Sequence, residues 1–361
     1  MTRTIRAALC RAHGEPFTIE EVRLAPPRAG EVQVEVDAVA ICHSDISFAA
    51  GAFGGHIPAV YGHEAVGRVS AVGEGVADRV EGNVVLVTLI HSCGRCVPCR
   101  SGHPVLCERV PGSLDHPLSL PDGTPVERGL QCGAFAEDVT VHASQTVKVP
   151  ADLPRAVAAT LSCGVITGVG AAVNTAGIRA GEDVVVIGAG GVGLNAIQGA
   201  RLAGARRIVA VDLAESKLED ARAFGATDAV KADDRPWRAV RGLLGRGADA
   251  VLVCVGAAEV YDDALRYAAP GGRVVAVGMP AADRRAGYGP MPISWQAQGI
   301  RGSKMGDVVL ARDIPWMVDL WQQGRLKLDE LVSRTWTLDE INEALADTKA
   351  GAARRNVIVL G

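Results

Sequence analysis

The chain has 361 residues, more than a single hydrophobic core usually serves, so we expect two domains. Charged residues make up 22% and hydrophobic residues 48%, ordinary globular values that exclude a disordered or fibrous protein. A formal net charge of −4 with interspersed signs argues against a nucleic-acid-binding surface. No apolar run approaches membrane-spanning length and the N-terminus is too polar for a secretory signal, so the sequence predicts a soluble, cytoplasmic protein.

The N-terminal part, up to about residue 150, is rich in short β-like runs separated by glycine, proline and aspartate turns. Strands are expected at 31–36, 65–76, 83–90 and 136–143. The alternating sequence EVQVEV at 31–36 predicts a half-exposed strand. These runs predict an antiparallel, barrel-like domain, and the aperiodic stretch 111–129 predicts a surface loop beside a group of cysteines.

Nine cysteines are many for such a chain, and in a cytosolic protein clustered cysteines mean metal or catalysis more often than disulfides. The strongest motif is a group of four with metal-ligand spacing: Cys93, Cys96, Cys99 and Cys107. Four sulfurs with no open position predict a structural Zn²⁺ site. An iron–sulfur cluster is the alternative, which the longer gap to Cys107 and the absence of other redox signatures disfavour. The flanking His91 and His103 are expected to be exposed to solvent.

From about residue 164 the pattern changes to alternating strands and helices, which predicts a doubly wound parallel sheet. Strands are expected at 184–187, 207–212, 228–230, 248–256, 271–279 and 299–303. Helices are expected at 194–202, 215–224 and 257–268.

A glycine-rich loop follows the first of these strands and fits G-x-G-x-x-G, a pattern that lets the backbone approach a pyrophosphate at a helix N-terminus. The residues expected at the cofactor are Gly188, Gly190, Gly191, Val192 and Gly193. Asp212 ends the next strand, where a carboxylate binds the ribose hydroxyls and repels a 2′-phosphate, which favours NAD over NADP. A glycine turn in another kind of α/β protein, and Asp212 as a helix N-cap, are the alternatives.

After about Met305 two helices are expected, the second over 338–348 with a capping box of Thr337 and Glu340. The chain ends in the strand-like NVIVL. A terminal strand has to pair with something, so we expect the last fifty or so residues to return to the first domain and make it discontinuous.

A second set of candidate ligands is dispersed along the chain: Cys42, His63 and Cys163. Two cysteines and a histidine would supply the three protein ligands of a catalytic zinc with one open position. Asp45 could accept a hydrogen bond from the other ring nitrogen of His63 and fix its tautomer. Spacing alone does not link these residues. Taken singly, Cys163 is better explained as a buried cysteine at a helix start and His63 as a surface residue.

The whole chain resembles the zinc-dependent medium-chain alcohol dehydrogenases, and its motifs are closest to the liver-type and glutathione-dependent formaldehyde dehydrogenase branch. The motifs occur in family order: ICHSD, GHEAVG, the four-cysteine segment, LSCGVITGVGAAVNTA, GAGGVG and VD. The resemblance implies an α/β protein with a discontinuous GroES-like β-barrel catalytic domain (1–164 and 306–361, zinc lobe at about 91–110). It also implies a Rossmann NAD-binding domain (165–305), with the active site in the cleft between the two.

The resemblance implies a role for each matching residue. It makes Cys42, His63 and Cys163 the catalytic zinc ligands, which is the Cys₂His set of alcohol dehydrogenases. Glu64 matches a residue close behind the metal, Ser44 the hydroxyl that passes the substrate proton, and His43 a cationic residue near the pyrophosphate. At the cofactor, Thr167 and Val192 match residues at the nicotinamide, Lys217 one at the adenosine ribose and Arg355 one at a phosphate. One position departs from the liver-type pattern. Ser47 stands where a histidine carries the proton onward, so the proton route beyond Ser44 is shortened or re-routed.

The reaction that the resemblance implies is reversible hydride transfer between NAD and an alcohol bound to catalytic zinc as alkoxide, giving an aldehyde or ketone. Two zinc ions per chain and a homodimer or homotetramer are expected, with a strand near 274–277 at a subunit interface. Apolar residues are expected to line the substrate pocket: Ile46, Phe53, Leu89, Leu114 and Met291. The alternatives are oxidation of a thiol–formaldehyde adduct, an inactive nucleotide-binding or redox-sensing relative, and a quinone reductase, which the cysteine segment disfavours.

Overall fold

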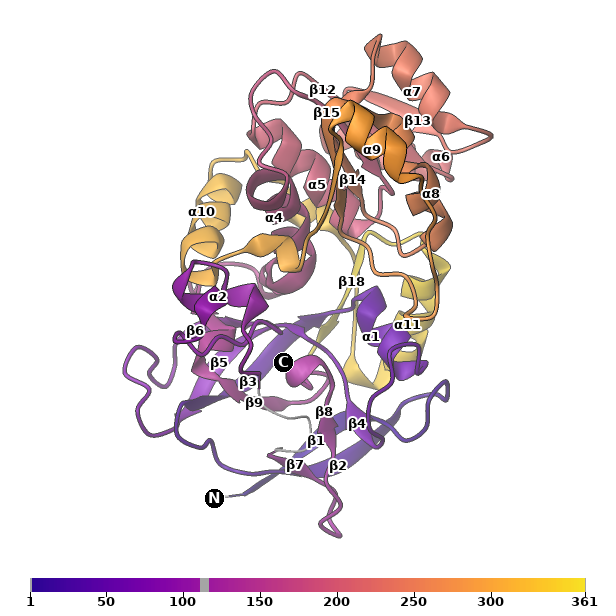
Figure 1. Ribbon diagram of the computed structural model, residues 1–361. Coiled ribbons are helices and arrows are strands. Elements are labelled where there is room, and N and C mark those ends of the chain that lie inside the picture. Colours follow the sequence, from indigo (N-terminus) through magenta and orange to yellow (C-terminus); the bar gives the residue numbers. More distant parts are fainter. Residues whose placement is uncertain (1, 111–116, 361) are drawn as a thin grey trace. The chain divides into compact units, whose positions relative to one another are not determined.

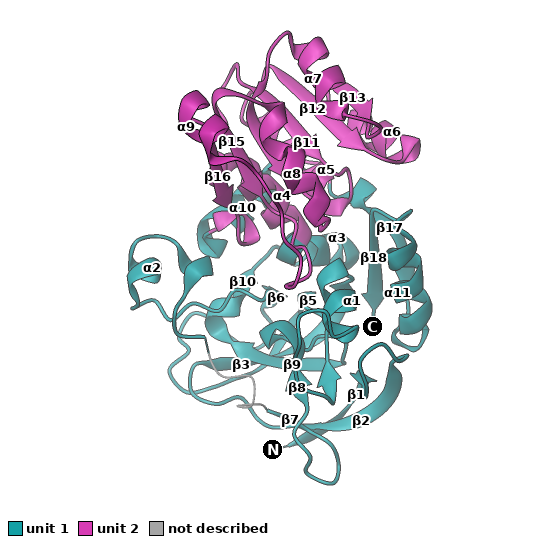
Figure 2. Cartoon of the chain, turned by 45° about the vertical axis from the view of Figure 1, so that its right-hand side comes forward, with its two compact units in different colours: residues 1–163, 309–321, 328–361 teal, residues 164–308, 322–327 magenta. Residues whose placement is uncertain are grey.

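The structure is a computed structural model that describes residues 2–110 and 117–360. The described chain divides into two compact units, coloured separately in Figure 2. Unit 1 comprises Met1–Cys163, Val309–Trp321 and Leu328–Gly361, and unit 2 comprises Gly164–Val308 and Gln322–Lys327.

Gln322–Lys327 belongs to unit 2, although the sequence analysis placed all of 306–361 in the first domain. The reason is a set of hydrogen bonds with no sequence signature. The side chain of Gln198 donates to the carbonyl of Lys327 (3.0 Å) and accepts from its backbone N–H (2.8 Å). The ammonium of Lys327 donates to the carbonyl of Ala223 (2.8 Å).

Unit 1 is built mainly from short strands, which form two sheets among the described residues. One sheet has the order β7-β2-β1-β4-β8, and the other has the order β10-β6-β5-β3-β18-β17 with β9 also paired to β3. The strands are β1 (Arg3–Cys10), β2 (Thr18–Leu24), β3 (Glu31–Ala40), β4 (Ala59–Val60), β5 (Glu64–Val72), β6 (Val84–Val87), β7 (Leu118–Ser119), β8 (Glu127–Arg128), β9 (Asp138–His142), β10 (Thr146–Lys148), β17 (Val332–Trp336) and β18 (Arg355–Val359). The helices are α1 (His43–Ala49), α2 (Val97–Arg100), α3 (Arg155–Thr160), α10 (Leu310–Gln322) and α11 (Ile341–Ala350).

The C-terminal strand β18 pairs antiparallel with β3, with Val357 opposite Ala40 (Figure 1). The predicted return of the chain to the first domain is therefore present. Thr337 and Glu340 form the predicted capping box, although it opens a short 3₁₀ turn, Leu338–Glu340, ahead of α11.

Two expectations for this unit are wrong. The strand at 31–36 is not half-exposed, because β3 pairs with β5 on one side and with β9 on the other, and Gln33 is buried between them. The stretch 111–129 is not simply a surface loop: 111–116 lies outside the described residues, but the remainder contains β7 and β8. Leu118 and Val126 are buried there in the core of the unit.

Unit 2 holds the predicted doubly wound sheet, whose strand order is β13-β12-β11-β14-β15-β16 with every pair parallel. The strands are β11 (Asp183–Ile187), β12 (Arg207–Asp212), β13 (Asp228–Lys231), β14 (Ala248–Val253), β15 (Ala268–Ala276) and β16 (Gly299–Gly302). The helices are α4 (Ile166–Gly170), α5 (Gly191–Leu202), α6 (Glu215–Ala223), α7 (Pro236–Leu244), α8 (Ala258–Tyr267) and α9 (Pro290–Gln296). The order reverses between β11 and β14, and in such sheets this switch point is where ligands bind, outside the carboxyl ends of the strands.

Helix α7 was not predicted from the sequence. It packs against α8, and Val240 and Leu244 join Val185 and Val209 in one buried cluster on that face of the sheet. A helical segment, Arg155–Thr175, is long and apolar enough by length and composition to cross a membrane, so the expectation that no run approaches this length is wrong. Its most apolar window is 89% buried within the protein, as expected of a core helix.

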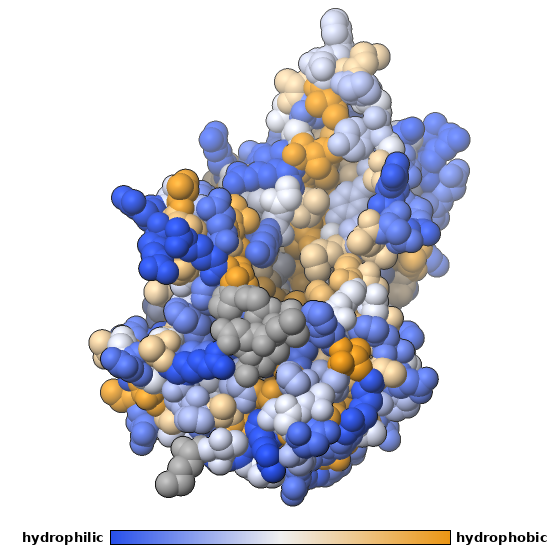
Figure 3. All heavy atoms as spheres, turned by 60° about the horizontal axis from the view of Figure 1, so that its bottom comes forward, coloured by the Kyte–Doolittle hydropathy of each residue, from blue (hydrophilic) through white to orange (hydrophobic). Residues whose placement is uncertain are grey.

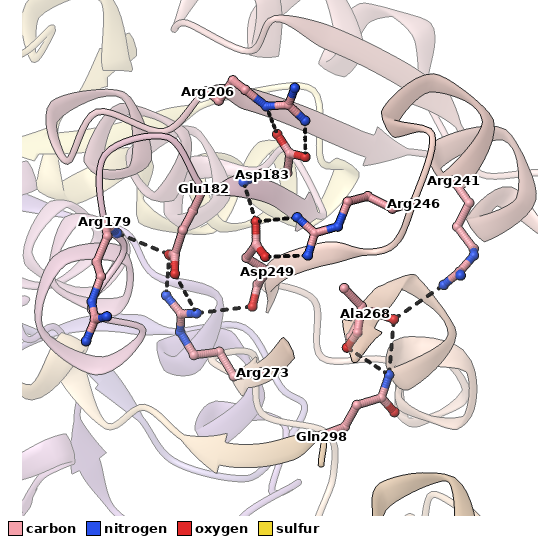
Figure 4. Close-up of polar contacts among 11 residues, drawn as sticks. Arg179, Glu182, Asp183, Arg206, Arg241, Arg246, Asp249, Ala268, Arg273 and Gln298 are labelled. Atoms are coloured by element: carbon pink, nitrogen blue, oxygen red, sulfur yellow. Dashed lines mark hydrogen bonds and ion pairs between the residues drawn. The ribbon is translucent and has the colours of Figure 1, made fainter. Parts of the chain in front are cut away.

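Ion pairs and hydrogen bonds between charged side chains link the amino ends of the sheet strands in unit 2 (Figure 4). Arg206 forms two hydrogen bonds with the carboxylate of Asp183, and Arg246 pairs with Asp249. Arg273 pairs with Glu182 (2.6 Å) and also donates to the carbonyls of Ala176 and Asp249. This network lies at the end of the sheet opposite to the glycine-rich loop.

On the face drawn in Figure 3, hydrophobic residues form small separate groups among hydrophilic ones.

Candidate active site and metal centres

Asp45 is the centre of a buried hydrogen-bond set in unit 1. β3 ends at Ala40 and α1 begins at His43, so the carboxylate lies in the first turn of a helix with Cys42 as its N-cap residue. Oδ2 accepts from the backbone N–H of Cys42 (3.2 Å). Oδ1 accepts from the backbone N–H of Gly62 (3.0 Å) and from Nδ1 of His63 (2.9 Å). The predicted contact between Asp45 and His63 is present, and both side chains are fully buried.

Gly62 makes this arrangement possible, and it was not among the residues predicted for the site. Its φ is +91°, and a Cβ atom built there would lie 2.7 Å from the backbone nitrogen of Phe135. No larger residue fits this conformation and this space. The glycine directly before His63 in YGHE was the available signal.

The structure brings the dispersed candidate ligands together. Cys42, His63, Glu64 and Cys163 each place one ligand atom within 4.8 Å of the others, and all four residues are buried. Because a carboxylate only accepts, Nδ1 of His63 carries the proton that binds Asp45, and Nε2 is left for a metal. Within the described residues Nε2 has no hydrogen-bond partner, although it is buried. Two thiols and this nitrogen fit zinc in a Cys₂His site.

Charge in this cluster is shared among its members. The hydrogen bond between the two thiols lowers the pKa of Cys42, which accepts it, and raises the pKa of Cys163, which donates it. Burial lowers the pKa of His63, but the charges and hydrogen bonds of Asp45 and Cys42 together outweigh it and raise that pKa well above its ordinary value. A metal ion would replace the protons that these groups hold.

Cys163 lies in a π-helical turn, Leu161–Val165, that continues α3. Such turns are rare in proteins, and those that occur are often found at functional sites. The buried hydroxyl of Ser162 donates to the carbonyl of Ala65 in β5 (3.0 Å), which ties the turn to the strand that follows His63. The apolar sequence alone predicted a helix here, but not the turn that carries the thiol.

Glu64 and Arg355 form a buried ion pair behind this cluster. The guanidinium Nη1 lies 3.3 Å from Oε1 of Glu64 and donates to the carbonyl of Ile41 (3.2 Å). Burial raises the pKa of Glu64 to about 8, although Arg355 lowers it. β18 carries Arg355 to this position, and the sequence predicted neither contact. The predicted contact of Arg355 with a cofactor phosphate stays a prediction.

The residues expected beside the catalytic zinc lie on α1. Ser44 is half-buried, with Oγ 3.6 Å from Sγ of Cys42, and His43 is exposed. Ser47 is also half-buried. The proton-passing and pyrophosphate roles of these residues stay predictions. Of the expected pocket residues, Ile46, Phe53 and Leu89 are half-buried, Met291 is 70% exposed, and Leu114 lies outside the described residues.

The second metal candidate is the four-cysteine group. The sulfur atoms of Cys93, Cys96, Cys99 and Cys107 all lie within 4.8 Å of one another. Backbone N–H groups donate to the sulfurs: that of Cys96 to Cys93, and those of Cys93 and Arg109 to Cys107, each at 3.4 Å. Backbone donors lower the pKa of Cys93 to about 6. Zn–S bonds of about 2.3 Å in a tetrahedron require sulfurs this close, so the group fits a closed structural zinc site.

His91 was expected to be exposed to solvent, and this expectation is wrong. The residue is buried against the four-cysteine group. Its Nδ1 lies 4.0 Å from Sγ of Cys107, and its ring contacts that of His142, with centroids 4.7 Å apart. Burial and the nearby His142 lower the pKa of His91 to about 4, so the imidazole is neutral. A histidine two residues before a metal-binding cysteine was the only sequence signal.

The glycine-rich loop in unit 2 begins α5 directly after β11. A Cβ atom on Gly193 would lie 1.8 Å from the carbonyl oxygen of Gly188, so the tight turn itself requires a glycine there. At Gly190 the same Cβ atom would meet no described atom within 4 Å, and φ is −76°. The protein does not need that glycine for its own packing, which fits a position kept clear for a pyrophosphate. The N-terminus of α5, Gly191 and Val192, has no side-chain cap, which leaves backbone donors for an anion.

Asp212 lies beside this loop. Its carboxylate accepts from the backbone N–H of Ala189 (2.7 Å) and of Ala214 (3.1 Å). The N-cap residue of α6 is Ala214, so Asp212 is not the N-cap that the alternative required. Lys217 is buried on α6, and Thr167 is buried on α4 with its hydroxyl 3.6 Å from Sδ of Met305. Their contacts with a cofactor, and that of Val192, stay predictions.

Two family models match this chain: "Alcohol dehydrogenase GroES-like domain" over residues 28–151 and "Zinc-binding dehydrogenase" over residues 191–323. The NDMA-dependent alcohol dehydrogenase of Amycolatopsis methanolica is 35% identical to it over 368 residues, which cover 98% of each chain. The chain belongs to the zinc-dependent medium-chain alcohol dehydrogenase family.

Solved structures agree with this membership. Benzyl alcohol dehydrogenase from Acinetobacter calcoaceticus has a TM-score of 0.93 and 30% identity, covering 99% of this chain and 100% of that one. A zinc-binding dehydrogenase homologue from Sinorhizobium meliloti 1021, solved with NADP, has a TM-score of 0.82 and 28% identity, covering 99% of each chain. This family member is therefore an oxidoreductase with alcohol dehydrogenase activity that uses zinc and a nicotinamide cofactor, and its predicted α/β fold is confirmed.

Proposed function

We propose that this alcohol dehydrogenase catalyses reversible hydride transfer between an alcohol and NAD, with one zinc ion at Cys42, His63 and Cys163 and a second at the four-cysteine group. The observation that carries the proposal is the buried Nε2 of His63, which has two thiols beside it and no partner among the described residues. Zinc bound there supplies a Lewis acid for the oxygen of the alcohol or carbonyl. A closed four-sulfur site has no open position and serves structure alone.

The protein's own groups have distinct tasks in this proposal. Asp45 holds the ring of His63 and its tautomer. Ser44, on the same helix turn as Cys42, takes the hydroxyl proton of the alcohol. Glu64 and Arg355 lie behind the cluster, where the guanidinium contacts the buried carboxyl group and ties β18 to the residue that follows His63.

The preference for NAD over NADP rests on Asp212. Two backbone N–H groups fix its carboxylate beside the glycine-rich loop, where a negative charge binds ribose hydroxyls and repels a 2′-phosphate. The neighbouring Leu213 is 74% exposed and carries no positive charge for that phosphate. We expect Asp212→Asn to lower the ratio of kcat/KM for NAD to that for NADP about tenfold (about 1.4 kcal/mol). An unchanged ratio would contradict this assignment.

Apolar primary alcohols, straight-chain and aryl, are the proposed substrates. The ring of Phe53 contacts that of Phe48 (centroids 5.1 Å apart), and Ile46 and Leu89 are also apolar. A structural relative is named benzyl alcohol dehydrogenase, which supports including aryl alcohols. The relatives do not favour the thiol–formaldehyde adduct.

The decisive experiment combines metal analysis with an alcohol and aldehyde screen. The purified protein should hold two zinc ions per chain and change NADH absorbance with at least one apolar alcohol. NDMA belongs in the screen as an acceptor, since a relative is named for its dependence on it. One zinc per chain with no turnover on any acceptor would instead identify an inactive nucleotide-binding relative.

A homo-oligomer formed through unit 2 is also proposed. The strand expected near the interface, 274–277, is part of β15, which lies next to the edge strand β16, and its place at an interface stays a prediction. β16 is the edge strand, its residues are all exposed, and Trp295 on the preceding α9 is 85% exposed. An open edge beside apolar residues invites pairing with a second copy. Light scattering of wild type and Ile300→Lys tests this: a monomeric wild type would exclude it.

A cytoplasmic location is proposed from the cysteines. None of the nine cysteines, all of which lie among the described residues, forms a disulfide, and the buried Cys10 and Cys132 belong to neither metal candidate. Thiols persist in a reducing compartment. Cell fractionation with an antibody tests this location, and recovery with secreted proteins would exclude it.

A further inference from the structure

We propose that His91 is a positioning residue of the four-cysteine zinc site, which donates a hydrogen bond from Nδ1 to the thiolate of Cys107. The inference rests on the proposed structural zinc and adds to it a partner outside the ligand set.

The geometry singles out one sulfur atom. Nδ1 of His91 lies 4.0 Å from Sγ of Cys107, and both residues are buried. The same sulfur accepts from the backbone N–H groups of Cys93 and Arg109, each at 3.4 Å. His91 is not part of the group of four ligand atoms that lie within 4.8 Å of one another. It therefore contacts a ligand without being one.

The chemistry of the bound state fixes the direction of this hydrogen bond. A thiolate on zinc has no proton to give, so the nitrogen must be the donor and His91 must hold its proton on Nδ1. Four thiolates on one Zn²⁺ carry a net charge of −2. Each N–H directed at a sulfur offsets part of that charge and holds the sulfur in place, as outer partners of metal ligands do.

Neighbouring groups hold the ring where it can donate. The ring of His142 packs against it at an interplanar angle of 60°. Nδ1 of His142 lies 2.8 Å from the hydroxyl of Ser144, and that hydroxyl accepts from the backbone N–H of Ser92 (3.0 Å). The last residue of β9 and the 3₁₀ turn after it, Ala143–Gln145, thus contact both His91 and the residue that follows it, directly before the first cysteine ligand.

Zinc release tests the inference with a readout other than turnover. In a Cys163→Ala background, zinc is expected at the four-cysteine site alone, and a chromogenic chelator then follows its release. Three substitutions of His91 separate the effect of losing the hydrogen-bond donor from the effect of losing the packing of the ring. His91→Phe keeps a ring against His142 but removes the donor. His91→Asn places an amide where Nδ1 lies, and His91→Gln places it where Nε2 lies.

We expect His91→Phe and His91→Gln to release zinc about 10–100-fold faster than the parent, and His91→Asn to release it close to the parental rate. Parental release from His91→Phe would overturn the inference. Equally fast release from all three variants would also overturn it, because packing would then explain the effect. A parent that holds no zinc would instead contradict the proposed structural site, so the two failures are distinguishable.

A second measurement needs no variant to fold. In ¹⁵N-histidine-labelled wild-type holoenzyme, the resonances of His91 should show a proton on Nδ1 and none on Nε2 in the zinc-bound state. A proton on Nε2 alone would leave no donor toward Cys107 and would overturn the inference.

Discussion

The carboxylate of Asp45 accepts a hydrogen bond from Nδ1 of His63 at 2.9 Å, and both side chains are fully buried in unit 1. The same carboxylate accepts from the backbone N–H groups of Cys42 and Gly62. One side chain therefore sets the position of two of the candidate zinc ligands, a thiol at the N-cap of α1 and an imidazole just before β5.

Asp45→Asn should weaken zinc binding at the Cys₂His site about 10–100-fold, because one amide oxygen cannot accept from all three donors. After mild dialysis against a chelator the variant should keep about one zinc per chain and the wild type about two. Asp78→Asn is the control, since Asp78 is 73% exposed in a surface ion pair. Equal zinc contents of the Asp45 variant and the wild type would contradict the positioning role.

Arg355→Met should destabilise the protein by about 3 kcal/mol, because it leaves the buried carboxyl group of Glu64 without its partner. Denaturant unfolding of the zinc-loaded protein measures the loss. The double variant Glu64→Gln/Arg355→Met should recover part of it. Arg6→Met is the matched control at an exposed pair with Asp339 and should cost at most about 1 kcal/mol. Similar losses for both single variants would refute the buried-pair argument.

Two glycines of the same loop should respond differently to alanine. Gly190→Ala should fold with an unchanged melting temperature but bind NADH about tenfold more weakly (about 1.4 kcal/mol), because its Cβ points into open space in the protein. Gly193→Ala should lower the melting temperature, since its Cβ would overlap the carbonyl of Gly188. Thermal unfolding and NADH fluorescence titration measure the two effects. Undiminished NADH binding by Gly190→Ala would show that the cofactor does not approach there.

Arg273→Met should cost about 2 kcal/mol at neutral pH through the lost bonds to Glu182 and to backbone carbonyls. Burial raises the pKa of Glu182, but the hydrogen bond and charge of Arg273, together with the hydrogen bond from the backbone N–H of Arg179, outweigh it, and the net pKa is lowered below the ordinary 4.5. A carboxylate with a lowered pKa stabilises the fold above its unfolded pKa, and this contribution is lost as the pH falls through the folded pKa. The difference between wild type and variant should therefore be largest at neutral pH and shrink in acid.

Urea unfolding at neutral pH and below pH 4.5 measures this difference. Arg284→Met, at a pair that is 58% and 66% exposed, is the control and should show little effect at either pH. A constant difference between wild type and Arg273→Met at both pH values would mean that the ionised Glu182 does not contribute.

The sequence by itself determined the features that are written in contiguous residues. From Val184 to Leu202 a strand, a glycine turn and a helix follow one another, and each has its own local pattern. The turn needs no distant partner, because Gly193 packs against the carbonyl group of Gly188. The alternation of strands and helices determined the parallel sheet for the same reason. The four cysteines needed only their spacing, since all of them lie in one short segment.

Only the tertiary structure decided which distant residues meet. Cys42, His63 and Cys163 lie far apart in the chain, and they converge because α1 follows β3, β5 pairs with β3, and a π-helical turn is tied to β5 by Ser162. Arg355 reaches Glu64 because the last strand pairs with β3. His91 is buried against the ring of His142, the last residue of β9, and Ser144 in the turn after β9 holds the neighbouring Ser92. A buried polar contact is specified by the packing of both partners, and neither partner's local sequence contains that information.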